Sequence, residues 1–60
     1  MKGYITYFNP VLGLIYLTSL TFINAFPVNY TYNKEEAVLF DKTSYDSISR
    51  NFKSLQFIQY

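Results

Sequence analysis

The longest feature of the hydrophobic pattern is an apolar segment that runs from Pro10 to Val28. Ten of its 19 residues are Val, Leu, Ile or Phe, and none is charged. A helix of this length rises about 28 Å, close to the hydrocarbon thickness of a bilayer, about 30 Å. Because Pro27 would end a helix near this point, the pattern predicts one transmembrane helix over residues 10–27.

Aromatic residues flank this segment on both sides. Tyrosine is enriched where a membrane-spanning helix meets water, because its ring lies among the headgroups while its hydroxyl reaches the solvent. We therefore expect a set of aromatic residues to mark the two membrane interfaces: Tyr4, Tyr7, Phe8, Tyr30 and Tyr32. This pattern favours a helix that is retained over a leader that is removed.

One side of the expected helix carries small and hydroxyl residues. Four positions at spacings of 4, 3 and 4 share this side: Leu14, Thr18, Thr21 and Ala25. Small and hydroxyl residues let two helix backbones approach closely inside a membrane. The spacing therefore predicts a helix-packing face toward a neighbouring subunit.

Two other interpretations of the first half stay open. Met1-Lys2, the apolar residues 11–23 and Ile23-Asn24-Ala25 loosely fit a signal peptide cleaved near Ala25. Cleavage there would release a secreted peptide of about 35 residues, which would act by binding a partner. The third interpretation is an apolar segment buried inside a large soluble assembly.

The second half is predicted to be a linker followed by a helical tail. Residues 29–33 alternate apolar and polar side chains and read as an extended linker after the N-terminal segment 1–28. The Asn33 side chain can accept hydrogen bonds from the first N–H groups of a helix, so residues 34–60 are assigned to a peripheral tail. Thr43 with Asp46 offers a second helix start, which places an amphipathic helix near residues 43–57.

This amphipathic helix has one apolar side. Its four apolar positions recur at spacings of 3, 4 and 3: Tyr45, Ile48, Phe52 and Leu55. If the first half lies in a membrane, the chain has nothing of its own to cover this side. Because acidic and basic residues are balanced on the opposite side, we expect it to dock on a neighbouring protein rather than on a membrane surface.

The charges are distributed unevenly. Nine residues are charged, and none of them lies between Lys2 and Lys34. The net charge of +1 and the mean hydropathy of +0.02 are therefore averages over two unlike halves. The chain has no Cys and no His, which excludes a disulfide framework and a typical zinc site. Sixty residues are marginal for a lone domain, so we expect partners to supply stability.

The sequence offers little for chemistry. Without His or Cys, the carboxylates lack a partner of suitable type for general acid–base catalysis, and no glycine-rich phosphate loop is present. We expect no catalytic, cofactor-binding or metal-binding residue. The chain lacks a basic stripe, so no nucleic acid is expected, and no small-molecule substrate either.

The N-terminal third resembles a known family. Ile5-Thr6-Tyr7-Phe8-Asn9-Pro10-Val11-Leu12, followed by Leu14-Ile15-Tyr16-Leu17 and Leu20-Thr21-Phe22, is similar to the start of subunit 8 of mitochondrial ATP synthase. The resemblance implies a single membrane helix in the membrane sector, a tail that reaches into the matrix, and no catalytic residue.

Together these patterns predict an all-α, non-globular chain with one transmembrane helix and one peripheral helix. Its expected function is that of a non-catalytic accessory subunit of a larger membrane complex, with the other subunits and the lipid bilayer as partners. The expected location is the mitochondrial inner membrane, in ATP synthase or a respiratory complex. The alternative is the secreted peptide.

Overall fold

The structure, a computed structural model, describes residues 1–60 and is built mainly from β-strands. Strands account for 43% of the residues and helical turns for 18%. The elements follow one another in this order: β1 (Lys2–Asn9), β2 (Gly13–Leu17), β3 (Phe22–Ile23), β4 (Phe26–Pro27), β5 (Tyr30–Thr31), the 3₁₀ turn η1 (Lys34–Glu36), β6 (Phe40–Asp41), α1 (Lys42–Ser49) and β7 (Leu55–Gln59).

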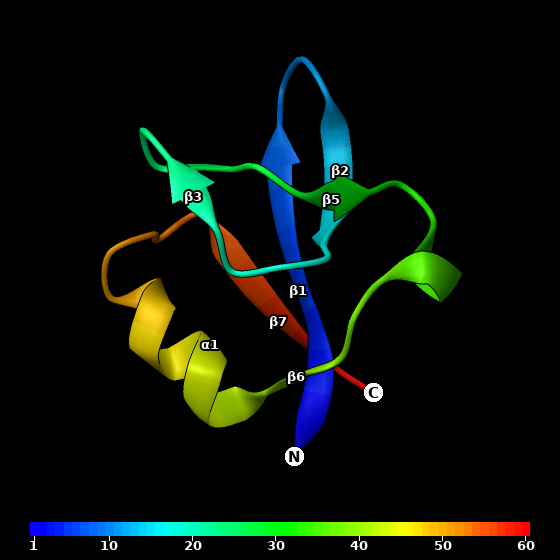
Figure 1. Ribbon diagram of the computed structural model, residues 1–60, viewed down its shortest axis with the longest axis vertical. Coiled ribbons are helices and arrows are strands. Elements are labelled where there is room, and N and C mark those ends of the chain that lie inside the picture. The colour runs from blue at the N-terminus through cyan, green and yellow to red at the C-terminus, as the bar shows by residue number, and fades with distance from the viewer.

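The main sheet has five antiparallel strands arranged around β1 (Figure 1). Tyr7 of β1 lies opposite Ile15 of β2 on one edge and opposite Leu55 of β7 on the other. β5 extends the sheet beyond β2, and β6 pairs with the first residues of β1. β1 is therefore the central strand, and it contacts three other strands of the sheet.

The β1–β2 hairpin owes its shape to its turn residues. The side-chain oxygen of Asn9 accepts hydrogen bonds from the backbone N–H groups of Val11 (2.8 Å) and Leu12 (3.1 Å). Gly13 then reverses the chain at φ +85°, a conformation that glycine adopts without steric cost. These contacts order the tip of the hairpin, which projects at the top of Figure 1.

A second hairpin joins β3 to β4 through the two residues Asn24 and Ala25. Both have positive φ angles, 54° and 63°, which is the geometry of a type I′ turn. Phe22 lies opposite Pro27 across this small sheet. Alanine is an unusual choice for the second turn position, where glycine is preferred, so this hairpin holds local strain.

Helix α1 packs against one side of the main sheet. Its Tyr45 and Ile48 contact the core, and the Tyr45 hydroxyl donates a hydrogen bond to the Leu55 carbonyl oxygen at 3.1 Å. The chain leaves the helix after Ser49 and returns as β7. Lys42 and Asp46, one turn apart on the exposed side of α1, form an ion pair at 3.1 Å.

The core is small and lies between the sheet and its cover. Ile5, Ile15 and Leu17 are completely buried, and Leu55 is nearly so. Partly buried apolar side chains pack around the cluster of Ile5, Leu17 and Leu55: Tyr7, Leu20, Phe22, Phe40, Tyr45, Ile48, Phe52 and Phe57. They come from α1, from β3 and from the strands and loops around the sheet.

The prediction of an all-α, non-globular chain is wrong. Residues 10–27, expected to form one transmembrane helix, contain the end of a hairpin, β2 and the β3–β4 hairpin. Gly13 and Asn24 turn the chain within this segment, and its Ile, Val, Phe and Tyr residues suit a pleated sheet. No helix in the structure combines the length and the apolar character that a membrane crossing needs.

The expected location is corrected by the same finding. Assignment to the mitochondrial inner membrane, as a single-pass subunit of ATP synthase or another complex, rested on a membrane-spanning helix at residues 10–27. The structure has short strands in its place. An uncharged apolar run of this length has two physical solutions, a helix in lipid or strands with apolar residues on both faces, and the second one applies here.

The helices of the second half are shorter than predicted. The Asn33 cap is confirmed, because its side chain accepts a hydrogen bond from the Glu35 N–H at 3.0 Å, but the helix it begins is only η1. The amphipathic helix expected over residues 43–57 is α1, which ends at Ser49, and residues 55–59 form β7. Segments 1–28, 29–33 and 34–60 all contribute strands to the main sheet.

Candidate functional site

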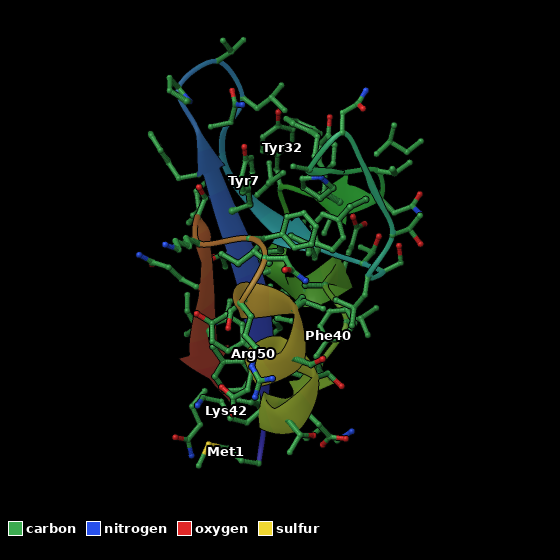
Figure 2. The ribbon with its side chains drawn as sticks, turned by 90° about the vertical axis from the view of Figure 1, so that its left-hand side faces the viewer. Met1, Tyr7, Tyr32, Phe40, Lys42 and Arg50 are labelled. Atoms are coloured by element: carbon green, nitrogen blue, oxygen red, sulfur yellow. The ribbon has the colours of Figure 1, made fainter.

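The two faces of the main sheet differ in what lies over them. Side chains alternate along β1, so Ile5 and Tyr7 point to one face while Tyr4, Thr6 and Phe8 point to the other. The first, which we name the covered face, lies against α1 and the β3–β4 hairpin. Figure 2 is seen from this side, with α1 in front of β1. The second we name the open face.

Strand register determines which residues share the open face. Phe8 lies opposite Leu14 of β2, and Tyr4 lies opposite Ile58 of β7. Directly opposed residues of antiparallel strands point to the same face. Tyr60, which follows β7, joins them, because its ring meets the ring of Tyr4.

Tyr4 occupies the centre of the open face. Its ring contacts Tyr16 and Tyr60 edge to face, with centroids 6.0 Å and 6.1 Å away. The Lys34 ammonium of η1 lies 5.3 Å from the Tyr4 ring centroid, within cation–π range. These neighbours leave Tyr4 buried.

The apolar side chains around this centre remain in solvent. The exposed fractions are 62% for Phe8, 45% for Leu14, 41% for Ile58 and 79% for Tyr60. Val11, at the tip of the β1–β2 hairpin, is almost fully exposed and extends the apolar surface beyond Phe8. We name the following residues the open-face patch: Phe8, Leu14, Tyr16, Ile58 and Tyr60.

β1 and β2 are more apolar than strands with one face in water usually are. An antiparallel sheet with one face in water normally alternates apolar and polar residues along each strand. Residues 4–8 of β1 and 14–17 of β2 are nearly continuous apolar runs, with Thr6 as the exception. Such runs are typical of strands that are covered on both faces. On the open face this chain buries Tyr4 and Thr6 but leaves Phe8 and Leu14 exposed.

The open-face patch is also free of charge. None of its five side chains is ionisable near neutral pH. Charged groups lie beside it: Lys34 of η1 reaches Tyr4, and Lys2, on the same face of β1, pairs with Asp41 at 3.3 Å. No three acidic side chains gather anywhere in the chain. The patch offers aromatic rings, aliphatic groups and tyrosine hydroxyls, a set that can bury apolar surface and form a few hydrogen bonds.

A cleft of about 350 Å³ opens between the β3–β4 turn and the loop that joins α1 to β7. Three aromatic side chains line it, Tyr7, Phe26 and Phe52, together with Asn24, Ala25, Asn51, Lys53 and Ser54. One side of the Phe52 ring is covered by Phe22, which stacks on it at 4.3 Å. The cleft belongs to the elements that cover the core and lies apart from the open face.

The residues expected to form a helix-packing face are not brought together as a helical stripe. Leu14 points from β2 to the open face, and Thr18 follows the end of that strand. Thr21 lies in the loop before β3, and Ala25 lies in the β3–β4 turn. Leu14 is the only one of the four that belongs to the open-face patch.

The residues expected to dock on a partner do come together, but within this chain. Tyr45 and Ile48 of α1 join Phe52 and Leu55 around the buried side chain of Ile5. The helical spacing places Tyr45 and Ile48 on the same side of α1. Phe52 and Leu55 reach the core because the chain turns back after α1 and forms β7. These side chains cover the core of their own sheet.

The expected interface aromatics divide between the two faces. Tyr4 and Phe8 point to the open face. Tyr7 contacts Phe26 on the covered side, and the chain of ring contacts continues to Tyr30 and Tyr32, with centroids 5.6 to 6.4 Å apart.

The open-face patch is the feature that the search for catalytic, metal-binding and helical motifs missed. The signal that could have revealed it is the absence of alternation in residues 4–8 and 14–17, read as a property of strands. Comparison of the chain with protein-family models, with curated proteins and with solved structures finds no match to any of them.

Proposed function

We propose that this chain is a non-catalytic interaction module that binds a protein through the open face of its sheet. The observation that supports it best is the composition of β1 and β2, whose apolar residues face both sides although the chain leaves Phe8 and Leu14 of the open face exposed. Apolar surface in water is unfavourable by about 25 cal/mol per Å², so a protein that covers the patch gains free energy of binding.

The chemistry of the patch supports a protein as the ligand. Protein interfaces are enriched in aromatic residues and depleted in Lys, Glu and Asp at their centres. The patch has Phe8, Tyr16 and Tyr60 and no charged side chain. Tyrosine adds a large rigid surface with a hydroxyl at its tip, which suits a contact that is apolar at the centre and wet at the rim.

The order of the patch also favours binding. The strand hydrogen bonds and the Asn9 side chain hold the Phe8–Leu14 pair and the hairpin tip in place before any partner arrives. A surface that is already ordered loses less conformational entropy when it binds.

Site-specific photo-crosslinking in cells of the native source tests this proposal. A photoreactive phenylalanine analogue replaces Phe8 or Tyr60 on the open face, and Tyr32 as the matched control. Tyr32 is an exposed aromatic that contacts Tyr30, on the covered side. We expect a discrete protein adduct from both open-face positions and none from Tyr32. Equal adducts at all three positions, or none at Phe8 and Tyr60, would contradict the proposal.

A further inference from the structure

We infer that the protein that covers the open face is a second copy of this chain, with the two patches packed against each other around a two-fold axis. This inference rests on the proposed function and names the partner. It would produce a four-layer assembly in which two sheets meet at the centre and each α1 lies on an outer side.

The charge distribution makes the open-face patch compatible with itself. In a two-fold contact each patch meets an identical patch, so a patch with one sign of charge would repel its copy. The five side chains of the patch carry no charge. Over the same face, the Lys34 ammonium lies 5.3 Å from the Tyr4 ring, and the Glu36 carboxylate accepts a hydrogen bond from Thr31, which lies opposite Tyr16, so each copy presents both signs of charge to the other.

The size of the chain supports a permanent cover. Domains near 60 residues bury a smaller fraction of their surface than larger domains do, and association with a further chain is a common way to stabilise them. Only six apolar side chains of this chain are buried: Tyr4, Ile5, Ile15, Leu17, Pro27 and Leu55. A standard interface covers about 800 Å² of each partner. This is about one fifth of the total accessible surface of 4069 Å².

The geometry of sheet packing fits the same arrangement. Two antiparallel sheets pack face to face about 10 Å apart, and their inner side chains interdigitate to form a core. The Phe8–Leu14 pair and Ile58 provide such side chains, while Tyr4 between them is already buried. The dimer would thus have a second core between its two sheets.

The test is the mass of the purified full-length chain in solution, measured by sedimentation over about 1 to 200 μM. We expect twice the 7.1 kDa of the single chain. Phe8→Lys places a charge in the proposed interface and should raise the dissociation constant by about 100-fold or more. Ile23→Lys is the matched control, because Ile23 is also 62% exposed but lies on the β3–β4 hairpin.

Two further measurements keep the test decisive. Leu14→Lys repeats the substitution from β2 in case Phe8→Lys fails to fold, and circular dichroism checks both variants. The melting temperature of the unmodified chain should rise with protein concentration, because dimerisation stabilises only the folded state. A monomer at about 200 μM, or a dimer that survives both lysine substitutions, would overturn the inference.

Failure of this inference is distinguishable from failure of the proposed function. If the chain is monomeric and the photoreactive analogue at Phe8 captures a different protein, the open face binds a protein that is not a second copy. If the chain is monomeric and Phe8 gives no adduct at all, both proposals fail. Adducts of twice the chain mass, from Phe8 and Tyr60 alone, support both.

Discussion

The two faces of one sheet carry similar residues and meet different surroundings. Ile5 and Phe8 lie on the same strand and are both apolar, yet Ile5 is completely buried and Phe8 is largely in solvent. The covered face has α1 and the β3–β4 hairpin over it, whereas the open face has the Lys34 side chain at its centre. An apolar residue on a strand therefore predicts that its face of the sheet will be covered. It does not tell whether the cover comes from the same chain or from another one.

The two faces of the sheet have different roles, one in folding and one in association. The covered face holds the chain in its fold, because its side chains leave water when the chain folds. On the open face Tyr4 and Thr6 are buried too, but Phe8, Leu14, Ile58 and Tyr60 stay exposed and are available for association. Substitutions on the two faces should therefore have separable effects on stability and on binding.

The largest expected effect is on the covered face. Leu17→Ala removes a completely buried side chain and should lower the free energy of unfolding by about 2–5 kcal/mol. A chain of this size has only about 3–9 kcal/mol in total, so much of the protein should unfold. Urea unfolding followed by circular dichroism measures this. Leu14→Ala, the same change on β2 but on the open face, should cost less than about 1 kcal/mol in the monomer.

Gly3 tests how closely β7 approaches the central strand. A Cβ atom there would lie 2.5 Å from the Ile58 carbonyl oxygen and from the Phe57 ring. Gly3→Ala should therefore lower the free energy of unfolding by about 1–3 kcal/mol, because the backbone of β7 must shift.

Gly13→Ala is the control for this change. No atom lies within 4 Å of a Cβ at Gly13, but its φ of +85° disfavours alanine. A cost of about 1 kcal/mol is expected there from backbone conformation alone. Equal costs at the two glycines would show that the close approach of β7 has no energetic consequence.

The contact between α1 and β7 gives a smaller effect. Tyr45→Phe removes the hydroxyl that donates to the Leu55 carbonyl oxygen while keeping the ring that packs on Phe57. The free energy of unfolding should fall by about 0.5–1.5 kcal/mol. Tyr60→Phe on the open face is the matched control and should leave it unchanged within about 0.5 kcal/mol. A loss at Tyr60 as large as at Tyr45 would contradict the assignment of stability to the covered face.

The smallest change should stabilise the protein. Ala25 has a φ of 63° at the second position of its turn, where glycine meets no steric cost. Ala25→Gly should raise the free energy of unfolding by about 0.5–1 kcal/mol, as a small increase in the melting temperature. If it instead lowers stability, the strain assigned to the β3–β4 hairpin is absent.

Local features of the second half were predictable, because they depend on residues close in sequence. The Asn33 side chain caps the turn that follows it, as expected from residue type alone. Tyr45 and Ile48 share one side of a helix because of their spacing. The end of α1 was not predictable from that spacing, since Phe52 and Leu55 continue the same period outside the helix.

The fold of the first half was not predictable in the same way. The composition of the uncharged run from Gly3 to Asn33 is equally compatible with a membrane helix and with a sheet that is apolar on both faces. The turn residues within it, Asn9, Gly13 and Asn24, carry the information that separates the two solutions. Each of them is individually tolerable in a helix, so the decision depends on all three acting together with the return of β7.

The sequence by itself determined that this chain has more apolar surface than it can bury alone, because 31 consecutive residues lack charge in a chain of 60. It also determined the cap at Asn33, since a cap depends on neighbouring residues. The turns at Gly13 and Asn24 fell inside the segment expected to be a helix. Only the tertiary structure decided which apolar residues are buried. The pairing of β1 with β2 and β7 assigns each side chain to one of the two faces of the sheet. Helix α1 then packs over the face that carries Ile5.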